Sequence, residues 1–439
     1  MAAARPVSPS PNGHLAPGRS PLVLACAFGL ALGSLACSAT GTGSDGAGGS
    51  GGGTGPSGSG GTPTSGNGGT PTTGSGGAPT GAGGSASGGR TGAGGGGGPA
   101  GQTGTGGTPS GAGGMAAMNE YWIGPNGSNS NPGTQAAPLA SVAFAHLYAR
   151  PGVTFWLLPG TYNIAATTTI STNGTAASPI NLFAAPGARP MLNYSTQAQA
   201  DGNRGFNITA DYWHMRGFEI RGAGDNCVAI SGSHNTIEDI ITDFCQDTGI
   251  QITVSSTQSG DLTRGAYNTI LNCDSHDNFD APTGENADGI DAKLDIGPGN
   301  VFRGCRSWNN SDDGYDLFGV TQVVTIDNCW AMLNGHTAAG MKGPDADGNG
   351  FKLGGNRVPA VHVVSNSFAM TNDTCGFTLN SNTATPKVTA CGVNGNKSTW
   401  CDGLQHSGDV TVTMTGAQAI AAPRVTNAAA GASTLPAIK

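Results

Sequence analysis

The sequence is short of charged residues, and basic residues are the scarcer kind. Asp, Glu, Lys and Arg make up 10% of the 439 residues, and 19 Lys and Arg against 27 Asp and Glu give a formal net charge of −8. A nucleic-acid-binding protein needs a basic face for phosphates. The charge balance therefore argues against a nucleic-acid partner. It leaves room for an acidic substrate if a metal ion lies between substrate and protein.

Long apolar runs are also lacking. One run, Pro21 to Ala36, follows Arg5 and Arg19 and is too short to span a bilayer comfortably. Such a run is typical of a signal-peptide core. Small residues before Cys37 resemble a bacterial lipoprotein cleavage site, although Ser34 stands where that pattern usually has Leu. We expect residues 1–37 to be a secretion or lipoprotein signal of a bacterium. The protein would then be secreted or held at the cell surface or outer membrane, with membrane contact only through lipid on Cys37.

Residues 38–118 contain almost nothing apolar to bury. From Gly41 to Gly114 about half of the residues are Gly, and most others are Ser, Thr, Ala or Pro. A segment of this composition cannot offset its backbone entropy by forming a core. We expect a flexible spacer over 38–118, one large domain over 119–415, a C-terminal tail over 416–439, and a monomer.

Helical spacing of apolar residues is missing from the second half, where short strand-like blocks repeat instead. Each block has an alternating apolar strand, a polar turn, a second short strand and a polar-Gly-apolar corner, with a period of about 22–25 residues. This pattern predicts an all-β parallel β-helix, a solenoid with one coil per block. We expect residues 139–150 to form a short N-terminal capping helix. Five blocks align: NTIEDIITDFCQDTGIQI from Asn235, NTILNCDSHDN from Asn268, NVFRGCRSWNNSDDGYDL from Asn300, VTIDNCWAMLNG from Val324 and VHVVSNSFAMTNDTCGFTL from Val361.

Turn and cysteine positions also repeat. Asn at the corners tolerates a left-handed backbone and can form side-chain ladders. Four cysteines are expected at one coil position, either as an interior stack of small side chains or with neighbours joined in disulfides: Cys245, Cys273, Cys305 and Cys329. Any two of Cys375, Cys391 and Cys401 could also form a disulfide in an exported protein.

Stacked coils turn the repeat into spatial columns. The residues before the corner glycines form a first predicted column: Thr248, Asp288, Asp313, Asn349 and Cys375. The residues three positions later form a second: Gln251, Asp291, Asp316, Lys352 and Thr378. The sequence therefore predicts that several carboxylates and one lysine lie together on adjacent coils.

Clustered carboxylates repel one another unless a cation lies among them. Ca²⁺ accepts six to eight oxygens in a flexible arrangement, and no Cys/His spacing here suits zinc. We therefore expect Ca²⁺ at Asp288, Asp312, Asp313 and Asp316. A structural calcium, or polar ladders without metal, are the alternatives. The stretch 343–350 resembles an EF-hand start but lacks the closing Glu.

Lys352 is expected beside these carboxylates, where it is either a base or an ion-pair partner of Asp316. A free lysine is a poor base at neutral pH, because its pKa is about 10.4. A nearby cation would lower that pKa, whereas carboxylates without a cation would raise it. A cation beside a basic side chain suits β-elimination of a uronic acid, in which the base removes the C5 proton.

The same residues resemble polysaccharide lyase family 9, the pectate lyases built on a right-handed parallel β-helix. The resemblance covers nearly all of 120–400. It rests on ENADGIDAKL from Glu285, GPGNVFRGCRSWNNSDDGYDLF from Gly297, GNGFKLGG from Gly348 and YWIGPNGSNSNPGTQAAPL from Tyr121. It implies that Asp288, Asp312, Asp313 and Asp316 bind Ca²⁺ and that Lys352 is the Brønsted base. Asp291 departs from the resemblance, which implies a small residue there.

The expected partner is an acidic, pectin-like polysaccharide. Five basic residues are candidates for binding its carboxylates, with ordinary surface charge as the alternative: Lys293, Arg303, Arg306, Lys342 and Arg357. His276 and His336 could line a cleft, but a catalytic role is not expected for either. Two rival functions remain. One is a polygalacturonase-like hydrolase, for which Asp312 and Asp313 could be the paired carboxylates. The other is a non-catalytic carbohydrate-binding β-helix.

Overall fold

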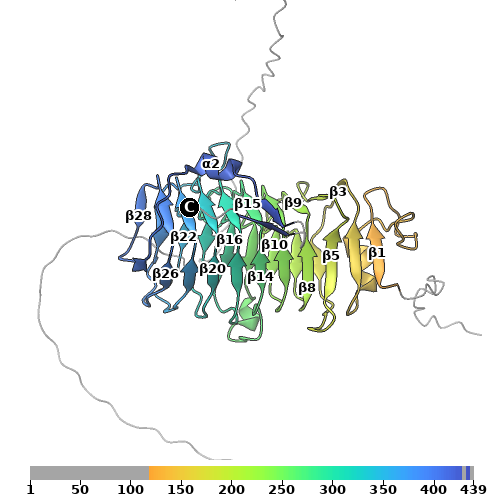
Figure 1. The fold of residues 1–439 in the computed structure, drawn as a ribbon. Coiled ribbons are helices and arrows are strands. Elements are labelled where there is room, and N and C mark those ends of the chain that lie inside the picture. Colours follow the sequence, from red (N-terminus) through yellow and green to blue (C-terminus); the bar gives the residue numbers. More distant parts are fainter. Residues whose placement is uncertain (1–117, 428–431, 436–439) are drawn as a thin grey trace, which may run out of the picture. The chain divides into compact units, whose positions relative to one another are not determined.

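A computed structural model describes residues 118–427 and 432–435. The predicted signal, 1–37, and nearly all of the predicted spacer, 38–118, lie outside the described residues. Strands dominate the described part, and they form three long parallel sheets, named here sheets A, B and C (Figure 1).

The three sheets are defined by their strands. Sheet A contains β1 (Glu120–Ile123), β2 (Thr154–Leu157), β5 (Ile180–Ala184), β8 (Trp213–Arg216), β11 (Thr236–Glu238), β14 (Thr269–Leu271), β17 (Val301–Arg303), β20 (Thr325–Asp327), β23 (Val363–Ser365), β26 (Lys387–Thr389) and β29 (His406–Ser407). Sheet B contains β3 (Thr161–Asn163), β6 (Met191–Asn193), β9 (Glu219–Arg221), β12 (Ile241–Asp243), β15 (Asp274–His276), β18 (Arg306–Trp308), β21 (Trp330–Met332), β24 (Phe368–Met370) and β27 (Gly392–Asn394). Sheet C contains β4 (Thr168–Ile170), β7 (Phe206–Ile208), β10 (Val228–Ile230), β13 (Ile250–Ile252), β16 (Ile290–Ala292), β19 (Tyr315–Asp316), β22 (Phe351–Lys352), β25 (Cys375–Thr378) and β28 (Ser398–Trp400).

The chain visits sheets A, B and C in turn, so each coil adds one strand to each sheet. Every neighbouring pair within these sheets is parallel, for example β11 with β14 and β16 with β19. Single residues with a left-handed backbone connect sheet A to sheet B, among them Asn272, Asn328 and Asn366, with φ of 55°, 51° and 50°. Asn adopts this conformation more readily than most residues. The predicted parallel β-helix and its Asn corners are therefore confirmed.

A ladder of buried asparagines lies just after the strands of sheet B. Asn310 Nδ2 donates to Asn334 Oδ1 at 3.0 Å, and Asn334 Nδ2 donates to Asn372 Oδ1 at 2.9 Å. Asn278 and Asn396 extend the ladder with bonds of 2.9 and 2.8 Å. These bonds satisfy amides that would otherwise be costly to bury. The ladder also keeps adjacent coils in register.

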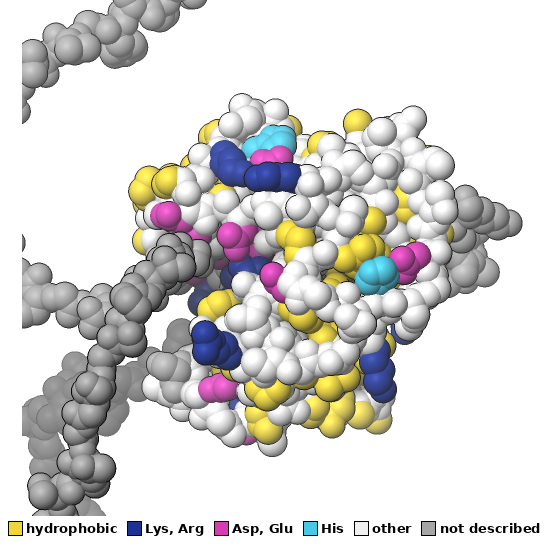
Figure 2. Space-filling model, turned by 90° about the vertical axis from the view of Figure 1, so that its left-hand side faces the viewer, with side chains coloured by type: hydrophobic (Ala, Val, Ile, Leu, Met, Phe, Trp, Pro, Cys, Tyr) yellow, Lys and Arg dark blue, Asp and Glu magenta, His cyan; other side chains and the backbone are white. Residues whose placement is uncertain are grey.

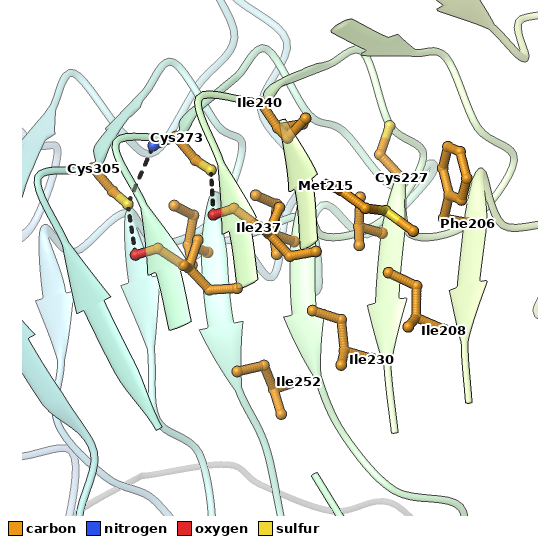
Figure 3. Packing of buried hydrophobic residues seen from close by; sticks show 14 of the residues in the cluster. Phe206, Ile208, Met215, Cys227, Ile230, Ile237, Ile240, Ile252, Cys273 and Cys305 are labelled. Atoms are coloured by element: carbon orange, nitrogen blue, oxygen red, sulfur yellow. Dashed lines mark hydrogen bonds between the residues drawn. The ribbon is translucent and has the colours of Figure 1, made fainter. Parts of the chain in front are cut away.

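The cysteine prediction is partly confirmed. Cys273, Cys305 and Cys329 are buried, unoxidised and at equivalent positions of successive coils. Cys305 Sγ lies 3.4 Å from the backbone nitrogen of Cys273 (Figure 3). Placing Cys245 in this column was wrong, because Ile241 pairs with Asp274 and Ile240 therefore stands opposite Cys273.

Two disulfides are present in the described residues. Cys245 is bonded to Cys227, and Cys375 is bonded to Cys401, while Cys391 is a buried free thiol. The second disulfide is one of the pairings that the sequence left open.

The predicted N-terminal helix is present but shorter than 139–150. It consists of α1 (Val142–Ala145) and a 3-10 turn, η1 (His146–Tyr148). Ser141 caps it by accepting a hydrogen bond from Phe144 N at 3.2 Å. A second 3-10 turn, η2 (Ser256–Gln258), lies in the loop after β13.

The described residues of the predicted tail, 416–427 and 432–435, include segments that pack against sheet B. It contains α2 (Gly416–Ala421), which lies along one side of the coil stack, and the antiparallel pair β30 (Val425–Asn427) and β31 (Ala432–Thr434) (Figure 1). Ala419 packs into a buried apolar cluster with Trp330 and Met332. Arg424 forms ion pairs with Asp274, which also pairs with Arg306 at 2.7 Å.

Charged side chains are sparse and scattered on the face seen from the C-terminal end of the stack, where most of the surface is neutral (Figure 2). Within residues 118–427 and 432–435, no helix combines the length and apolar character that crossing a membrane requires.

Candidate active site

Sheet C places the second predicted column on its outer face. The strand pairing aligns Gln251 with Asp291, Asp291 with Asp316, and Asp316 with Lys352. Side chains alternate between the two faces of a strand, so the neighbours of Asp316 and Lys352 point inward. These inner neighbours are Tyr315 and Phe351, whose aromatic rings are stacked with their centroids 4.7 Å apart. The predicted order of the column is confirmed, and it rests on a rigid aromatic core.

The first predicted column lies beside it, at the entry to the same strands. Asp313 N donates to Asp288 Oδ1 at 3.0 Å, and Asn349 N donates to Asp313 Oδ1 at 2.6 Å. Each of these carboxylates is therefore fixed by the backbone of the next coil. The adjacent Asp312 accepts a bond from Asp347 N at 2.7 Å.

Two insertions cover these columns, whose side chains would otherwise be exposed on the outer face of the coils. The loops 277–289 and 333–350 contact each other, since Asp345 N donates to the carbonyl of Thr283 at 3.2 Å. Asp288, near the end of the first loop, and Asp313 are fully buried, and Asp316 is 2% exposed. A cleft of about 310 Å³ remains open between the insertions, lined by Glu285, Asn286, Lys293, Asp312, Asp316, Phe318, Asp345, Asp347 and Lys352.

The carboxylates are arranged so that they could hold a cation. Single oxygens of Asp288, Asp313 and Asp316 all lie within 4.8 Å of one another, and Asp312, Asp313 and Asp347 form a second such group. Asp291 Oδ1 and Asp316 Oδ1 are buried and have no hydrogen-bond donor among the described residues, whereas Asp313 Oδ2 faces the Lys352 ammonium at 3.1 Å. Buried oxygens of this kind are costly unless a ligand pairs with them. The residues present therefore fit a hard cation that takes oxygen ligands.

Burial and mutual repulsion make these carboxylates hard to ionise without such a cation. Burial raises the pKa of Asp288 to about 6, with Asp316 adding to the rise and Lys293 opposing it. Burial also raises the pKa of Asp313 to about 7, and Lys352 opposes that rise. For Asp312, burial and the neighbouring Asp313 raise the pKa well above its usual range.

Lys352 points its ammonium group into this cluster. Its Nζ lies 3.1 Å from Asp313, 3.2 Å from Asp347 and 3.7 Å from Asp316. Burial lowers the pKa of Lys352, but Asp313 and Asp316 outweigh burial and leave the pKa well above its usual value. These carboxylates therefore favour the protonated form of Lys352.

Lys293 joins the same cluster from the other side. Its Nζ lies 2.8 Å from Asp288, 3.4 Å from Asp291 and 3.6 Å from Asp316. Asp291 also accepts bonds from Thr248 at 2.8 Å and Gln251 at 3.0 Å. Asp291 therefore pairs with Lys293 and not with Lys352. The aspartate that stands where the family resemblance implied a small residue thus affects the surroundings of Lys293, on the side of the site away from Lys352.

The structure does not bring the other four predicted basic residues into the cleft. Arg303 on sheet A pairs with Asp327 at 3.2 Å. Arg306 lies on sheet B, where it pairs with Asp274 and donates to the carbonyl of Ala422 at 3.1 Å. These arginines face different sides of the coil from sheet C, so the structure does not support their predicted contact with substrate.

Lys342 and Arg357 lie in loops near sheet C but outside the cleft lining. Lys342 pairs with Asp373 at 3.0 Å, and His336 lies 3.2 Å from the same carboxylate. Arg357 follows β22 in a left-handed turn with φ of 57°. His276 stacks on Trp308 at 4.4 Å, on the outer face of sheet B. Neither predicted histidine lines the cleft.

Several cleft residues were not predicted from the sequence. Asp347 makes two contacts in the cleft. Its carboxylate pairs with Lys352, and its backbone N–H donates to Asp312. Glu285, Phe318 and Asp345 also line the cleft. The signal for Asp347 and Asp345 was the acidic insertion at 343–350, but an insertion has no place in the repeat and so could not be assigned to a column.

Comparison with known proteins adds an independent line of evidence. Residues 121–406 match the family described as the Pel9A-like, right-handed β-helix region. The chain is 40% identical over 297 residues to pectate lyase L of Paenibacillus polymyxa (strain SC2), covering 66% of this chain and 65% of that relative. It is 38% identical to pectate lyase L of Dickeya chrysanthemi, covering 60% and 62%. The chain thus spans a little under two thirds of the length of these relatives.

Solved structures agree with this match. The crystal structure of pectate lyase Pel9A aligns with a TM-score of 0.60 and 34% identity, covering 68% of this chain and 78% of that one. A rhamnogalacturonan lyase aligns with a TM-score of 0.53 and 28% identity, covering 64% and 73%. The predicted family resemblance and the right-handed parallel β-helix are confirmed.

Proposed function

Because this chain belongs to the Pel9A-like right-handed β-helix family, we propose that it is a calcium-dependent pectate lyase that cleaves polygalacturonate or a related uronan by β-elimination. One observation carries the proposal beyond family membership. Lys352 Nζ lies within 3.7 Å of Asp313 and Asp316 at the floor of an open cleft. A basic side chain and a group of cation ligands therefore share one small volume that a sugar can enter.

In this proposal Asp288, Asp312, Asp313 and Asp316 hold Ca²⁺. A bound calcium would neutralise part of the substrate carboxylate charge and acidify the proton on C5. The backbone N–H groups of Asp313 and Asn349 orient the carboxylates of Asp288 and Asp313 for binding a cation. Of the remaining buried oxygens, Asp316 Oδ1 has no hydrogen-bond donor among the described residues, and Asp313 Oδ2 contacts Lys352 Nζ at 3.1 Å.

Lys352 is proposed to accept the C5 proton. In the structure its ammonium is stabilised by Asp313, Asp316 and Asp347. When those carboxylates instead neutralise a divalent cation, burial becomes the dominant effect on Lys352 and favours its neutral, basic form. Lys293 is proposed to bind a uronate carboxylate from the opposite wall of the cleft.

The test is formation of an unsaturated product. Purified protein is incubated with polygalacturonate, with added calcium or with EDTA, and ultraviolet absorbance follows the new C4–C5 double bond. We expect product only with calcium. Lys352→Ala should reduce kcat by about 10²–10⁴-fold, the usual contribution of a general base. Lys387→Ala removes an exposed lysine of β26 and serves as the matched control.

The rival functions give different outcomes in the same assay. A hydrolase would release reducing ends without ultraviolet absorbance, and its activity would survive loss of Lys352. A non-catalytic binder would retain polygalacturonate and release nothing. Either result would end the lyase proposal.

We also propose that the protein is an exported monomer, either free or attached through lipid on Cys37. The apolar run of Pro21 to Ala36 supports export, although it lies outside the described residues. The disulfides Cys227–Cys245 and Cys375–Cys401 support an oxidising compartment. Globomycin-sensitive processing with labelled fatty acid on Cys37 would distinguish the lipoprotein from the simple secreted form.

A further inference from the structure

A second and larger hollow lies on sheet C, toward the N-terminal coils. It has a volume of about 530 Å³, and its floor is formed by Asn207, Ala229 and Gln251 on β7, β10 and β13. The strand pairing aligns these three residues with one another and then with Asp291. The floor of the hollow is therefore the continuation of the column that carries Asp316 and Lys352.

The separation suits a polymer that follows this column. Asn207 lies four strands before Asp316, and a spacing of 4.7–4.9 Å between neighbouring strands gives a distance of about 19 Å. Ala229 lies between Asn207 and Gln251, and its small side chain does not obstruct the floor of the hollow. A chain of several sugars lying along sheet C can therefore reach the hollow from the candidate active site.

Gln251 connects the two places directly. It lines the hollow, and its Nε2 donates to Asp291 Oδ2 at 3.0 Å. Asp291 in turn lies 3.4 Å from Lys293, which lines the cleft. The hollow and the cleft thus adjoin along one row of contacting side chains.

The lining of the hollow suits an acidic sugar. Arg204 is the one charged residue among those that line it, and the others are neutral, with hydroxyls supplied by Thr209, Ser231 and Thr253. Arg204 Nε lies 3.2 Å from the buried Asp225, and its Nη1 donates to Asn207 at 3.3 Å. These contacts fix the guanidinium at the edge of the hollow, where its side chain is 30% exposed.

We propose that this hollow is a distal subsite of the lyase, in which Arg204 binds the carboxylate of a uronate several sugars away from the bond that is cleaved. The proposal rests on the lyase function proposed above. A guanidinium can pair with a carboxylate through two parallel hydrogen bonds, and the surrounding hydroxyls can bond to the sugar hydroxyls. The subsite would make the protein favour long chains over short ones.

The test compares long polygalacturonate with trigalacturonate, which is too short to reach from Lys352 to Arg204. Arg204→Ala should raise KM for the long substrate about tenfold with little change in kcat, and leave the kinetics on trigalacturonate unchanged. Arg204→Lys should recover part of the loss. Arg189→Ala removes an arginine whose ion pair with Asp239 lies outside the hollow, and is the matched control.

A second variant guards against misfolding of the first. Ala229→Tyr fills the floor of the hollow and keeps Arg204 and Asp225 in the sequence, and it too should raise KM for the long substrate alone. The subsite is refuted if both variants match the wild type on long chains, or if either changes trigalacturonate cleavage equally.

A binding assay separates failure of the subsite from failure of the lyase function. Electrophoresis through a gel containing polygalacturonate measures retention of the protein, which does not require cleavage. Arg204→Ala is compared with the protein that keeps Arg204, both with Lys352 present and in the Lys352→Ala background. If the wild type forms no unsaturated product but Arg204→Ala still loses retention, the hollow binds uronan and the lyase proposal fails alone. If product forms and retention is unchanged, the subsite fails alone.

Discussion

Asp316→Asn offers a test of the proposed calcium site that does not depend on catalysis. The substitution keeps the shape of the side chain but removes one charge from the group formed with Asp288 and Asp313, whose oxygens lie within 4.8 Å of one another. It leaves the hydrogen bonds between the backbone and Asp288 and Asp313 intact, since Asp316 takes no part in them.

The electrostatic effect in the absence of metal is small because opposite terms nearly cancel. At an effective dielectric constant of about 20, each repulsion at up to 4.8 Å amounts to about 3.5 kcal/mol. Each attraction to Lys293 and Lys352, at 3.6 and 3.7 Å, amounts to about 4.5 kcal/mol. Asp316 therefore makes two attractions, and they are opposed by repulsions from Asp288, Asp313 and its paired neighbour Asp291. We expect the metal-free variant to unfold within a few degrees of the wild type.

The effect in the presence of metal is large. A ligand at a hundred times its Kd stabilises a protein by about 2.7 kcal/mol, which corresponds to roughly 5–10 °C at a few degrees per kcal/mol. Thermal unfolding in EDTA and in calcium should show this increase for the wild type and little of it for Asp316→Asn. Asp201→Asn, on an exposed turn, should respond like the wild type. A full calcium shift in Asp316→Asn would refute the assignment of Asp316 as a ligand.

Two further predictions concern the scaffold. Asn334→Ala removes two rungs of the asparagine ladder and takes away the acceptor of the backbone N–H and of one side-chain N–H of Asn310, while Asn372 Oδ1 keeps its bond from the backbone N–H of residue 334. Thermal or denaturant unfolding should therefore show a loss of about 2–4 kcal/mol. Asp274→Asn leaves Arg306 and Arg424 without their shared carboxylate and should cost about 3–5 kcal/mol. Burial raises the pKa of Asp274, but Arg424 and Arg306 outweigh it and hold the pKa below its ordinary value. The stabilisation is therefore complete above about pH 4 and lost as the pH falls through the folded-state pKa, and this acid-dependent part of the unfolding curve should be missing from the variant.

The repeat predicted the columns of sheet C because strand pairing preserves sequence spacing. Asp291, Asp316 and Lys352 each stand three residues after the residue that precedes a corner glycine, and in the structure they are paired neighbours. The same reasoning placed Cys245 wrongly, because this cysteine follows strand β12 and was aligned with cysteines that directly precede the equivalent strands. A column can thus be read from sequence only where a corner glycine or a turn marks the register.

Long-range contacts of the loops could not be predicted in this way. Asp347 reaches Lys352 because the insertion 333–350 folds back over sheet C and meets the loop 277–289. Arg306 was a plausible substrate ligand until its partner Asp274 and the returning segment around Arg424 were placed on sheet B. Neither contact follows from the period, since insertions and termini lie outside it.

The charges of the site explain why the two lysines and the carboxylates belong together. The cluster contains six carboxylates, Asp288, Asp291, Asp312, Asp313, Asp316 and Asp347, against two ammonium groups, Lys293 and Lys352. Two positive charges cannot balance six negative ones, and burial raises the pKa of Asp288, Asp291, Asp312 and Asp313. A divalent cation would remove most of this excess and would also release Lys352 from the carboxylates that keep it protonated. In the proposed mechanism the cation would replace Lys352 as the partner of these carboxylates and leave Lys352 free to act as a base. We therefore expect metal binding and catalysis to fail together when Asp316 is changed.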